Sequence, residues 1–385
     1  MHGYFDSISV PLNLPVSAFQ PQTAPKQNNK GKGKGKETPQ AQAGQAKPPL
    51  YHVVDSWTDQ QRDEMEKKVH MASLLGYSTL LLTLSIPPTF DPSLLSFPTP
   101  LFPQLDPRTA KPGSEGLVLQ LWRINIEGYG DEAVKGAGQK GWFGFANSTA
   151  ALYPSQTTLL SLTPTTLTSF SHTALSLSPP SAFSPTLVTL DPSLHPRLPF
   201  PLKRGLISSL SRAGVGFELV LRGVTRQDEA GEQAGEAGRR RRNWIAGARE
   251  VVRATAGKGV VISSGAVRAG EMRASEDLIN LCSLIGLPPA QAKDALTVNP
   301  QRAVMRGLSL RQTYRGVLSN PTLVTYPLTS SPSAALTPES VPSTTPKKRA
   351  AEKAAWEGEA EAAGAGAVED TGGIGGKAQG KKRKT

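Results

Sequence analysis

Cysteine and long apolar runs are almost absent from this sequence, and each absence excludes a class of protein. The one cysteine, Cys282, lies in an apolar stretch where a thiol behaves as a small hydrophobic group. A single cysteine cannot build a disulfide framework, which fits a reducing compartment. The N-terminus has no charged segment followed by a hydrophobic run, and no stretch reaches the roughly 18 apolar residues of a membrane span. We therefore expect a soluble, intracellular protein without a membrane partner.

Hydrophobic residues are also few, at 38%, whereas glycines and prolines number 37 and 33. Segments of that composition cannot bury enough apolar surface to offset the entropy lost on ordering. On this ground we predict unstructured, low-complexity insertions at about 20–49, 87–116 and 224–238 and a disordered basic tail at 327–385. The rest of residues 1–326 is predicted to form one folded domain.

Positive charge is in excess, with a formal net charge of +12 and a pI near 9.7. Nucleic acid is the first candidate partner, because Lys and Arg that neutralise phosphates release condensed counterions. The tail carries two short basic clusters of the nuclear-localisation type, although a merely solubilising tail remains an alternative. These clusters are Lys347, Lys348 and Arg349, and Lys381, Lys382, Arg383 and Lys384.

A unit of helix, glycine and buried strand recurs three times. In the first copy Thr58 and Gln61 form a capping-box pattern, Gly76 ends the helix, and residues 77–86 are apolar enough for a strand buried on both faces. The other copies have their glycine and strand at Gly214 and 215–221, and at Gly257 and 259–264.

Short connections from each helix to the next strand predict a parallel sheet covered by helices. Both a barrel and an open doubly wound sheet have this arrangement. Further strands are expected at 4–10, 117–126, within 150–162 and at 186–190. Seven candidate strands favour an α/β fold of the TIM type, a (β/α) barrel.

Local patterns predict three further features of this fold. Apolar residues switch from odd to even positions near Leu121 and Trp122, which indicates a bulge or a bend. Ser275 is expected to cap a helix, and a second helix should run from Pro288 to about Asn299.

The sequence resembles the thirty-kilodalton protein subunit family of ribonuclease P and ribonuclease MRP. The densest similarity covers residues 260–268 and 271–273, and the order and spacing of the other segments extend it over most of the predicted domain. Those segments are 5–6, 75–78, 203–204, 216–220, 277–281, 284–287, 292–295, 299 and 302–304.

The resemblance implies a barrel related to the polymerase-and-histidinol-phosphatase group of metal-dependent phosphoesterases. It further implies a protein that assists a catalytic RNA and needs no cofactor. With the basic clusters of the tail, we expect this protein in the nucleus and the nucleolus. That RNA removes the 5′ leader of precursor tRNA, or processes ribosomal RNA in the MRP particle. The implied partners are the ribonuclease P and MRP RNAs, precursor tRNA, a small ferredoxin-like subunit and other proteins of the complex.

A catalytic or metal site of its own is not expected in this chain. Phosphoesterases of the related group need clustered His and carboxylate ligands to generate a hydroxide nucleophile. The five histidines form no close pair; they are His2, His52, His70, His172 and His195.

Three carboxylates leave a weaker alternative open, because Asp6, Asp191 and Glu218 could collect at the barrel mouth and bind Mg²⁺. The competing interpretation is that Asp6 and Glu218 are buried groups satisfied by Arg or backbone. Ser263 and Ser264 lack the His and Asp partners of a serine nucleophile. Three hypotheses follow: an RNA-binding subunit, a divergent metal phosphoesterase, or a protein-only scaffold.

Basic residues follow several predicted strands, so a barrel would gather them at its carboxyl-terminal face, where such folds place their sites. Four consecutive arginines are expected immediately before a helix, where the positive end of the helix dipole makes cations unfavourable. Contact with phosphate would explain why they are there. Arg268 and Arg273 alternatively pair with Glu271, Glu276 or Asp277 and hold their own loop. The alternative is that these cations are only a solvated charge run in flexible loops, above all in the Lys-Gly repeat at 31–36. The predicted RNA- or partner-binding residues are Lys203, Arg204, Arg239, Arg240, Arg241, Arg242, Arg268 and Arg273.

Overall fold

The computed structural model describes residues 3–13, 50–136, 153–181, 183–226, 235–314 and 318–319. The first of two compact units in the chain ends at Thr322. The predicted insertion at 20–49 and the tail at 327–385, with both of its basic clusters, lie outside the described residues. Of the insertion predicted at 224–238, residues 227–234 also lie outside them, but residues 224–225 and 236–238 are helical, so the prediction was wrong at both ends of that segment. No helix in the described segments is long and apolar enough to cross a membrane.

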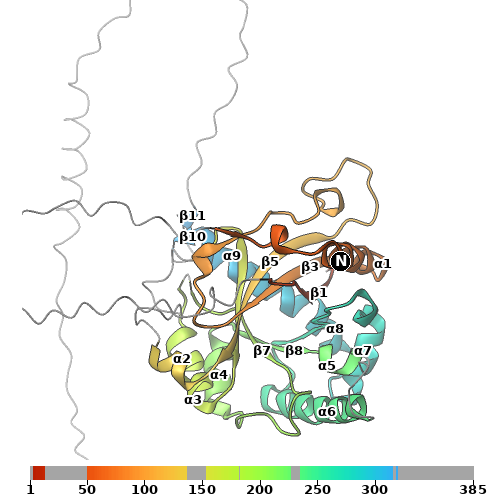
Figure 1. The fold of residues 1–385 in the computed structure, drawn as a ribbon. Coiled ribbons are helices and arrows are strands. Elements are labelled where there is room, and N and C mark those ends of the chain that lie inside the picture. Colours follow the sequence, from red (N-terminus) through yellow and green to blue (C-terminus); the bar gives the residue numbers. More distant parts are fainter. Residues whose placement is uncertain are drawn as a thin grey trace, which may run out of the picture. The chain divides into compact units, whose positions relative to one another are not determined.

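Seven parallel strands form one sheet in which every strand pairs with the next one along the chain. The ends of this sheet meet, because Ser9 N–H donates to the Ala266 carbonyl at 3.0 Å and Gly265 N–H donates to the Ser7 carbonyl at 2.8 Å. The result is a nearly closed barrel of the TIM type, which confirms the predicted fold class (Figure 1). Its strands are β1 (Tyr4–Ser9), β3 (Tyr77–Ile86), β5 (Leu119–Tyr129), β6 (Thr157–Pro164), β7 (Leu187–Leu190), β8 (Gly216–Val220) and β9 (Val260–Ser263).

Helices lie between the strands along the chain and after the last strand of the barrel, and they pack around the barrel (Figure 1). They are α1 (Asp59–Leu74), α2 (Asp131–Gly136), α3 (Leu167–His172) continued by the π-helical turn η6 (Thr173–Leu177), α4 (Arg204–Arg212), α5 (Arg222–Thr225), α6 (Glu236–Thr255), α7 (Ser275–Leu284), α8 (Pro289–Leu296) and α9 (Val298–Gln312). Shorter elements are β2 (Tyr51–His52), η2 (Val54–Ser56), η3 (Pro92–Leu94), β4 (Leu95–Ser96), η4 (Pro103–Leu105), η7 (Ala269–Glu271), β10 (Thr313–Tyr314) and β11 (Leu318–Ser319).

Local sequence signals fix the start and end of α1 as predicted. The Thr58 side chain accepts from Gln61 N–H and the Gln61 side chain accepts from Thr58 N–H, which completes the capping box. Gly76 follows with a φ of +80°, a conformation that favours glycine. The bulge or bend expected in β5 is confirmed by a register shift against β6 between Trp122 and Arg123.

The proline-rich segment 87–116 is ordered, so the prediction that it is unstructured was wrong. Its apolar side chains pack against the outer core of the barrel: the rings of Phe97 and Trp122 lie 4.4 Å apart, and Trp122 Nε1 donates to the Pro98 carbonyl. Asp106 is fully buried and accepts two hydrogen bonds from the Arg108 guanidinium. Proline content alone misled the prediction, because the interspersed apolar residues Phe90, Leu94, Leu95, Phe97 and Leu101 bury enough surface to order the segment.

The C-terminal helices differ from the prediction at their boundaries. Ser275 is the first residue of α7, whose N-cap position is Ala274, and no side chain caps it. The helix that opens at Pro289 ends at Leu296, and Asn299 belongs to a separate helix, α9.

Helix α9 covers the amino-terminal end of the barrel, where the strands begin. Asn299 Nδ2 donates to the Val260 carbonyl at 2.7 Å, and a Cβ on Gly307 would lie 2.5 Å from the Thr158 carbonyl oxygen. Glycine is therefore required where α9 crosses β6. The apolar side chains sealed between the strands and α9 are Phe5, Leu81, Leu121, Leu159, Leu187 and Val261, with Ala303 and Val304 from the helix.

Candidate functional site

A polar layer lies inside the barrel directly above the apolar layer that α9 seals. Side chains alternate between the two faces of a strand, so residues two positions further along each strand face the same interior. The residues two positions after the apolar ones of the sealed layer are all polar, and β8 contributes Glu218. They are Ser7, Thr83, Arg123, Ser161, Thr189 and Ser263, which follow Phe5, Leu81, Leu121, Leu159, Leu187 and Val261.

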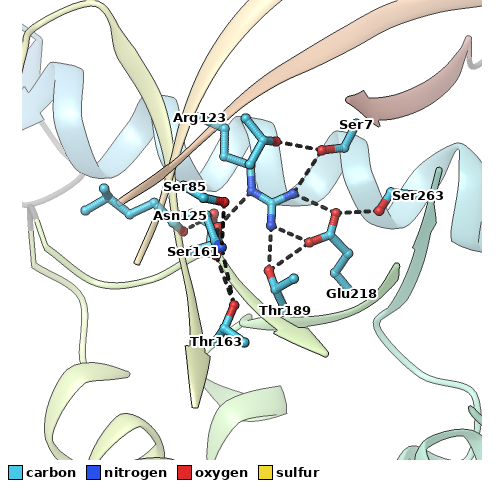
Figure 2. A network of polar contacts seen from close by, with 12 residues as sticks. Ser7, Ser85, Arg123, Asn125, Ser161, Thr163, Thr189, Glu218 and Ser263 are labelled. Carbon is cyan, nitrogen blue, oxygen red and sulfur yellow. Dashed lines mark hydrogen bonds and ion pairs between the residues drawn. The ribbon is translucent and has the colours of Figure 1, made fainter. Parts of the chain in front are cut away.

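A buried ion pair between Arg123 and Glu218 occupies the centre of this layer (Figure 2). Arg123 Nη1 donates to Glu218 Oε1 at 2.6 Å, and Arg123 Nη2 donates to Glu218 Oε2. Both residues are about 1% exposed. The pair thus joins β5 to β8 across the interior of the barrel.

Hydroxyl groups satisfy the remaining atoms of the pair. Ser161 Oγ accepts from Arg123 Nε at 2.8 Å and donates to Asn125 Oδ1 at 2.9 Å. Thr189 Oγ1 accepts from Arg123 Nη2 at 2.6 Å and donates to Glu218 Oε2 at 2.8 Å. Ser7 Oγ accepts from Arg123 Nη1 at 3.2 Å, and Ser263 Oγ donates to Glu218 Oε1 at 2.7 Å.

The network keeps Glu218 ionised although it is buried. Burial alone raises the pKa of a carboxyl group, but the charge of Arg123 and hydrogen bonds from Arg123, Ser263 and Thr189 lower the pKa of Glu218 below its ordinary value. Arg123 stays charged at any ordinary pH and so supplies the countercharge that the buried carboxylate needs.

Asp6 is satisfied separately, on the seam where β1 meets β9. It accepts hydrogen bonds from Ser264 N–H and Ser264 Oγ, both at 2.7 Å, and from Ser7 N–H at 2.8 Å. Burial raises the pKa of Asp6 to about 6, and the charge of Glu218 adds to this shift. The interpretation that Asp6 and Glu218 are buried groups satisfied by Arg or backbone is confirmed.

Above the ion pair the barrel opens into a cavity of about 130 Å³ at its carboxyl-terminal end. Asn125, Thr163, Asp191 and Arg222 line the cavity together with the ion pair. Asp191 Oδ1 is engaged by the N–H and hydroxyl of Ser193, at 3.0 and 2.6 Å. Among the described residues, no group of three or more His, Cys, Asp or Glu is placed to hold a metal ion.

The predicted basic residues lie where strands are followed by loops and helix starts, so topology places them at the carboxyl-terminal end of the barrel. Lys203 is the N-cap residue of α4 and Arg204 its first residue; both are exposed. Arg268 and Arg273 are exposed in the loop that follows β9. Arg273 Nη1 donates to the carbonyls of Gly270 and Met272, at 2.8 and 2.7 Å, and so holds its own loop through carbonyls rather than carboxylates.

The four consecutive arginines lie inside α6 and not before it, which corrects the prediction. Helix α6 begins at Glu236, after Gly235 with a φ of +89°, because Glu, Ala and Arg are good helix formers. The helix dipole therefore repels these arginines only weakly, because its effect falls off within the first turn of the helix. It no longer argues for phosphate contact. Arg239 pairs with Glu236 at 3.1 Å and Arg241 Nε donates to the Val224 carbonyl at 3.2 Å; Arg239, Arg241 and Arg242 are exposed and Arg240 is half-buried.

Two residues of the carboxyl-terminal end were missed by the sequence interpretation. Arg123 had a visible signal, because a guanidinium in the middle of an apolar strand needs a buried partner. Lys68 had none, because it occupies an ordinary position in an amphipathic helix; it is 1% exposed and its Nζ donates to the Ser9 carbonyl at 2.6 Å.

The sequence of this chain matches a known protein family. Residues 52–312, about two thirds of the chain, match the family of RNase P subunit p30. The chain belongs to the RNase P subunit p30 family. The resemblance inferred from the sequence is thereby confirmed.

Similar proteins include two curated members of this family. A probable ribonuclease P protein subunit 3 from Schizosaccharomyces pombe is 29% identical over 123 residues, which cover 32% of this chain and 48% of the relative. The ribonuclease P protein subunit p30 of Mus musculus is 32% identical over 123 residues, which cover 32% of this chain and 42% of the relative. The matched regions thus span less than half the length of these relatives.

Solved structures include a chain of archaeal ribonuclease P determined with mature tRNA. It has a TM-score of 0.42 and 13% identity, and the match covers 68% of this chain and 95% of the archaeal one.

Proposed function

We propose that this p30-family chain is a non-catalytic, RNA-binding protein subunit of ribonuclease P and of ribonuclease MRP. In that role it supports removal of the 5′ leader of precursor tRNA and the processing of ribosomal RNA, while the RNA of each particle performs the chemistry. The observation that carries the proposal is the Arg123–Glu218 pair at the centre of the barrel. A phosphoesterase would need metal-bound water there, and a guanidinium repels a divalent cation.

The distribution of cations supports RNA binding at the carboxyl-terminal end of this barrel. Lys203, Arg204, Arg268 and the arginines of α6 extend from helix starts or loops at that end. Cations gathered on one surface neutralise phosphates and raise affinity without reading sequence. We propose the ribonuclease P and MRP RNAs and precursor tRNA as the nucleic acids, and a ferredoxin-like small subunit among the protein partners.

We expect the purified chain to leave precursor tRNA uncut in Mg²⁺ or Mn²⁺, because its buried carboxylates are engaged by Arg123 and by Ser264. The measurement is gel analysis of 5′-labelled precursor tRNA after incubation with the isolated chain. Cleavage by the wild-type chain that is lost in a Glu218→Gln variant shown by thermal unfolding to be folded would instead establish a divergent metal phosphoesterase.

We also propose that the protein acts in the nucleus, in the nucleolus above all, and that the basic clusters of the tail direct it there. Deletion of residues 328–385 is expected to reduce nuclear accumulation and to leave the thermal unfolding of the barrel unchanged, because the deletion removes no described helix or strand. Imaging of a tagged truncation measures the first effect and calorimetry the second. Full nuclear accumulation of the truncated chain would refute this role of the tail.

A further inference from the structure

A groove of about 400 Å³ lies beside the barrel mouth, at the seam where β1 meets β9. Helix α1 forms one wall, and the loop after β9 forms the other through Val267 and Arg268. Ser9 and Pro11, from the end of β1 and the residues beyond it, complete the lining. The groove therefore opens at the same end of the barrel as the basic residues proposed to bind RNA.

Lys68 lines this groove, and burial makes it unusual among the lysines of α1. It is 1% exposed, whereas its neighbour Lys67 is exposed on the outer face of the helix. An ammonium group has three donors, and the described residues offer Lys68 Nζ the Ser9 carbonyl as its acceptor. Buried charges are ordinarily paired, so a second acceptor of negative charge is needed to complete this site.

The carboxylates that face Lys68 do not pair with it in the described part of the chain. Glu64 Oε1 accepts from Ala269 N–H at 2.6 Å, and Glu271 Oε2 accepts from Val267 N–H at 2.8 Å and from Arg268 N–H at 3.3 Å. Both carboxylates thus hold the loop after β9 in place. Arg222 faces Lys68 from the side of α5 and adds positive charge.

We propose that this groove receives a backbone phosphate of the bound RNA, with the Lys68 ammonium at its base and Arg268 at its rim. The proposal rests on the proposed RNA-binding function. It adds a specific site, in which the phosphate supplies the anionic oxygens that the Lys68 donors lack. Phosphate fits the chemistry because its oxygens accept charge-assisted hydrogen bonds from ammonium and guanidinium groups together.

Proton linkage gives this site a signature that a purely structural lysine would not have. Burial lowers the pKa of Lys68 to about 8, with Arg222 acting in the same direction and Glu64 and Glu271 opposing it. A bound phosphate favours the charged ammonium and raises that pKa, so RNA binding takes up a proton near pH 8. RNA affinity of the full chain should therefore weaken about tenfold between pH 7 and pH 9, as the protonated fraction of the free lysine falls.

The test is fluorescence anisotropy of labelled ribonuclease P RNA with the full chain at pH 7, 8 and 9. We expect the tenfold loss with the wild type and with Lys67→Met, a weaker and pH-independent affinity with Lys68→Met, and recovery of pH-independent affinity with Lys68→Arg. Thermal unfolding of each variant identifies any that does not fold, and the wild-type pH profile needs no variant at all.

Two results would overturn the phosphate site while leaving the proposed function intact. One is wild-type RNA affinity that is constant from pH 7 to pH 9. The other is a folded Lys68→Met that binds RNA as the wild type does but fails to capture protein subunits, which would assign the groove to a protein partner. A wild-type chain that binds no RNA at any pH would refute the proposed function itself.

Discussion

Arg123→Met is expected to lower the free energy of unfolding of the barrel by about 3–5 kcal/mol, because it leaves the Glu218 carboxylate buried without its partner. The hydroxyls of Thr189 and Ser263 remain as donors, but neither carries a compensating charge. The measurement is chemical denaturation of the variant and the parent protein. A folded variant as stable as the parent would contradict the role given to this pair.

The double variant Arg123→Met/Glu218→Leu is expected to recover part of that loss, since removing both charges removes the uncompensated one. Arg239→Met breaks an exposed pair with Glu236 and serves as the matched control, with an expected cost of at most about 1 kcal/mol.

The contribution of Glu218 to the stability of the parent protein should decrease at acid pH. Its pKa is lowered on folding, so its contribution is present above the unfolded value and is lost as pH falls through the folded value.

Replacement of Arg239, Arg240, Arg241 and Arg242 by glutamine should weaken RNA binding and flatten its salt dependence. The slope of log affinity against log salt is expected to fall by about one for each arginine that contacts a phosphate. Stability should change little, because the pair of Arg239 with Glu236 and the bond from Arg241 to the Val224 carbonyl are exposed contacts, and exposed contacts contribute little. Titrations from 50 to 200 mM salt measure both quantities.

A matched control removes the same charge from the other end of the barrel. Arg212 and Arg253 lie at the ends of α4 and α6, and Lys258 and Arg302 line a hollow at the amino-terminal ends of β8 and β9. Their replacement by glutamine should leave affinity nearly unchanged at moderate salt. Equal losses from both sets would mean that net charge, and not the carboxyl-terminal face, governs binding.

Several of the strands were predictable because each carries its own signal. A buried parallel strand such as Tyr77–Ile86 reads as a continuous apolar run, and Gly76 marks where the preceding helix ends. The capping box of Thr58 and Gln61 is likewise local, since both partners lie within four residues. Repetition of that unit predicted a parallel sheet covered by helices, and the number of candidate strands favoured a barrel.

The central ion pair could not be predicted, because 95 positions separate Arg123 from Glu218 along the chain. Their meeting depends on the register of β5 and on closure of the barrel, and a shift of one residue would turn Arg123 outward. The order of segment 87–116 and the separate helix α9 depend similarly on surfaces that other strands provide. Composition therefore described these parts poorly.

Purification of the tagged chain from cells, with sequencing of the RNA that accompanies it, tests the central claim most directly. We predict that ribonuclease P RNA, MRP RNA and precursor tRNA are enriched, that the purified complex cleaves precursor tRNA, and that destroying its RNA abolishes cleavage. Recovery of a protein complex without these RNAs, or cleavage that survives complete removal of RNA, would contradict the account.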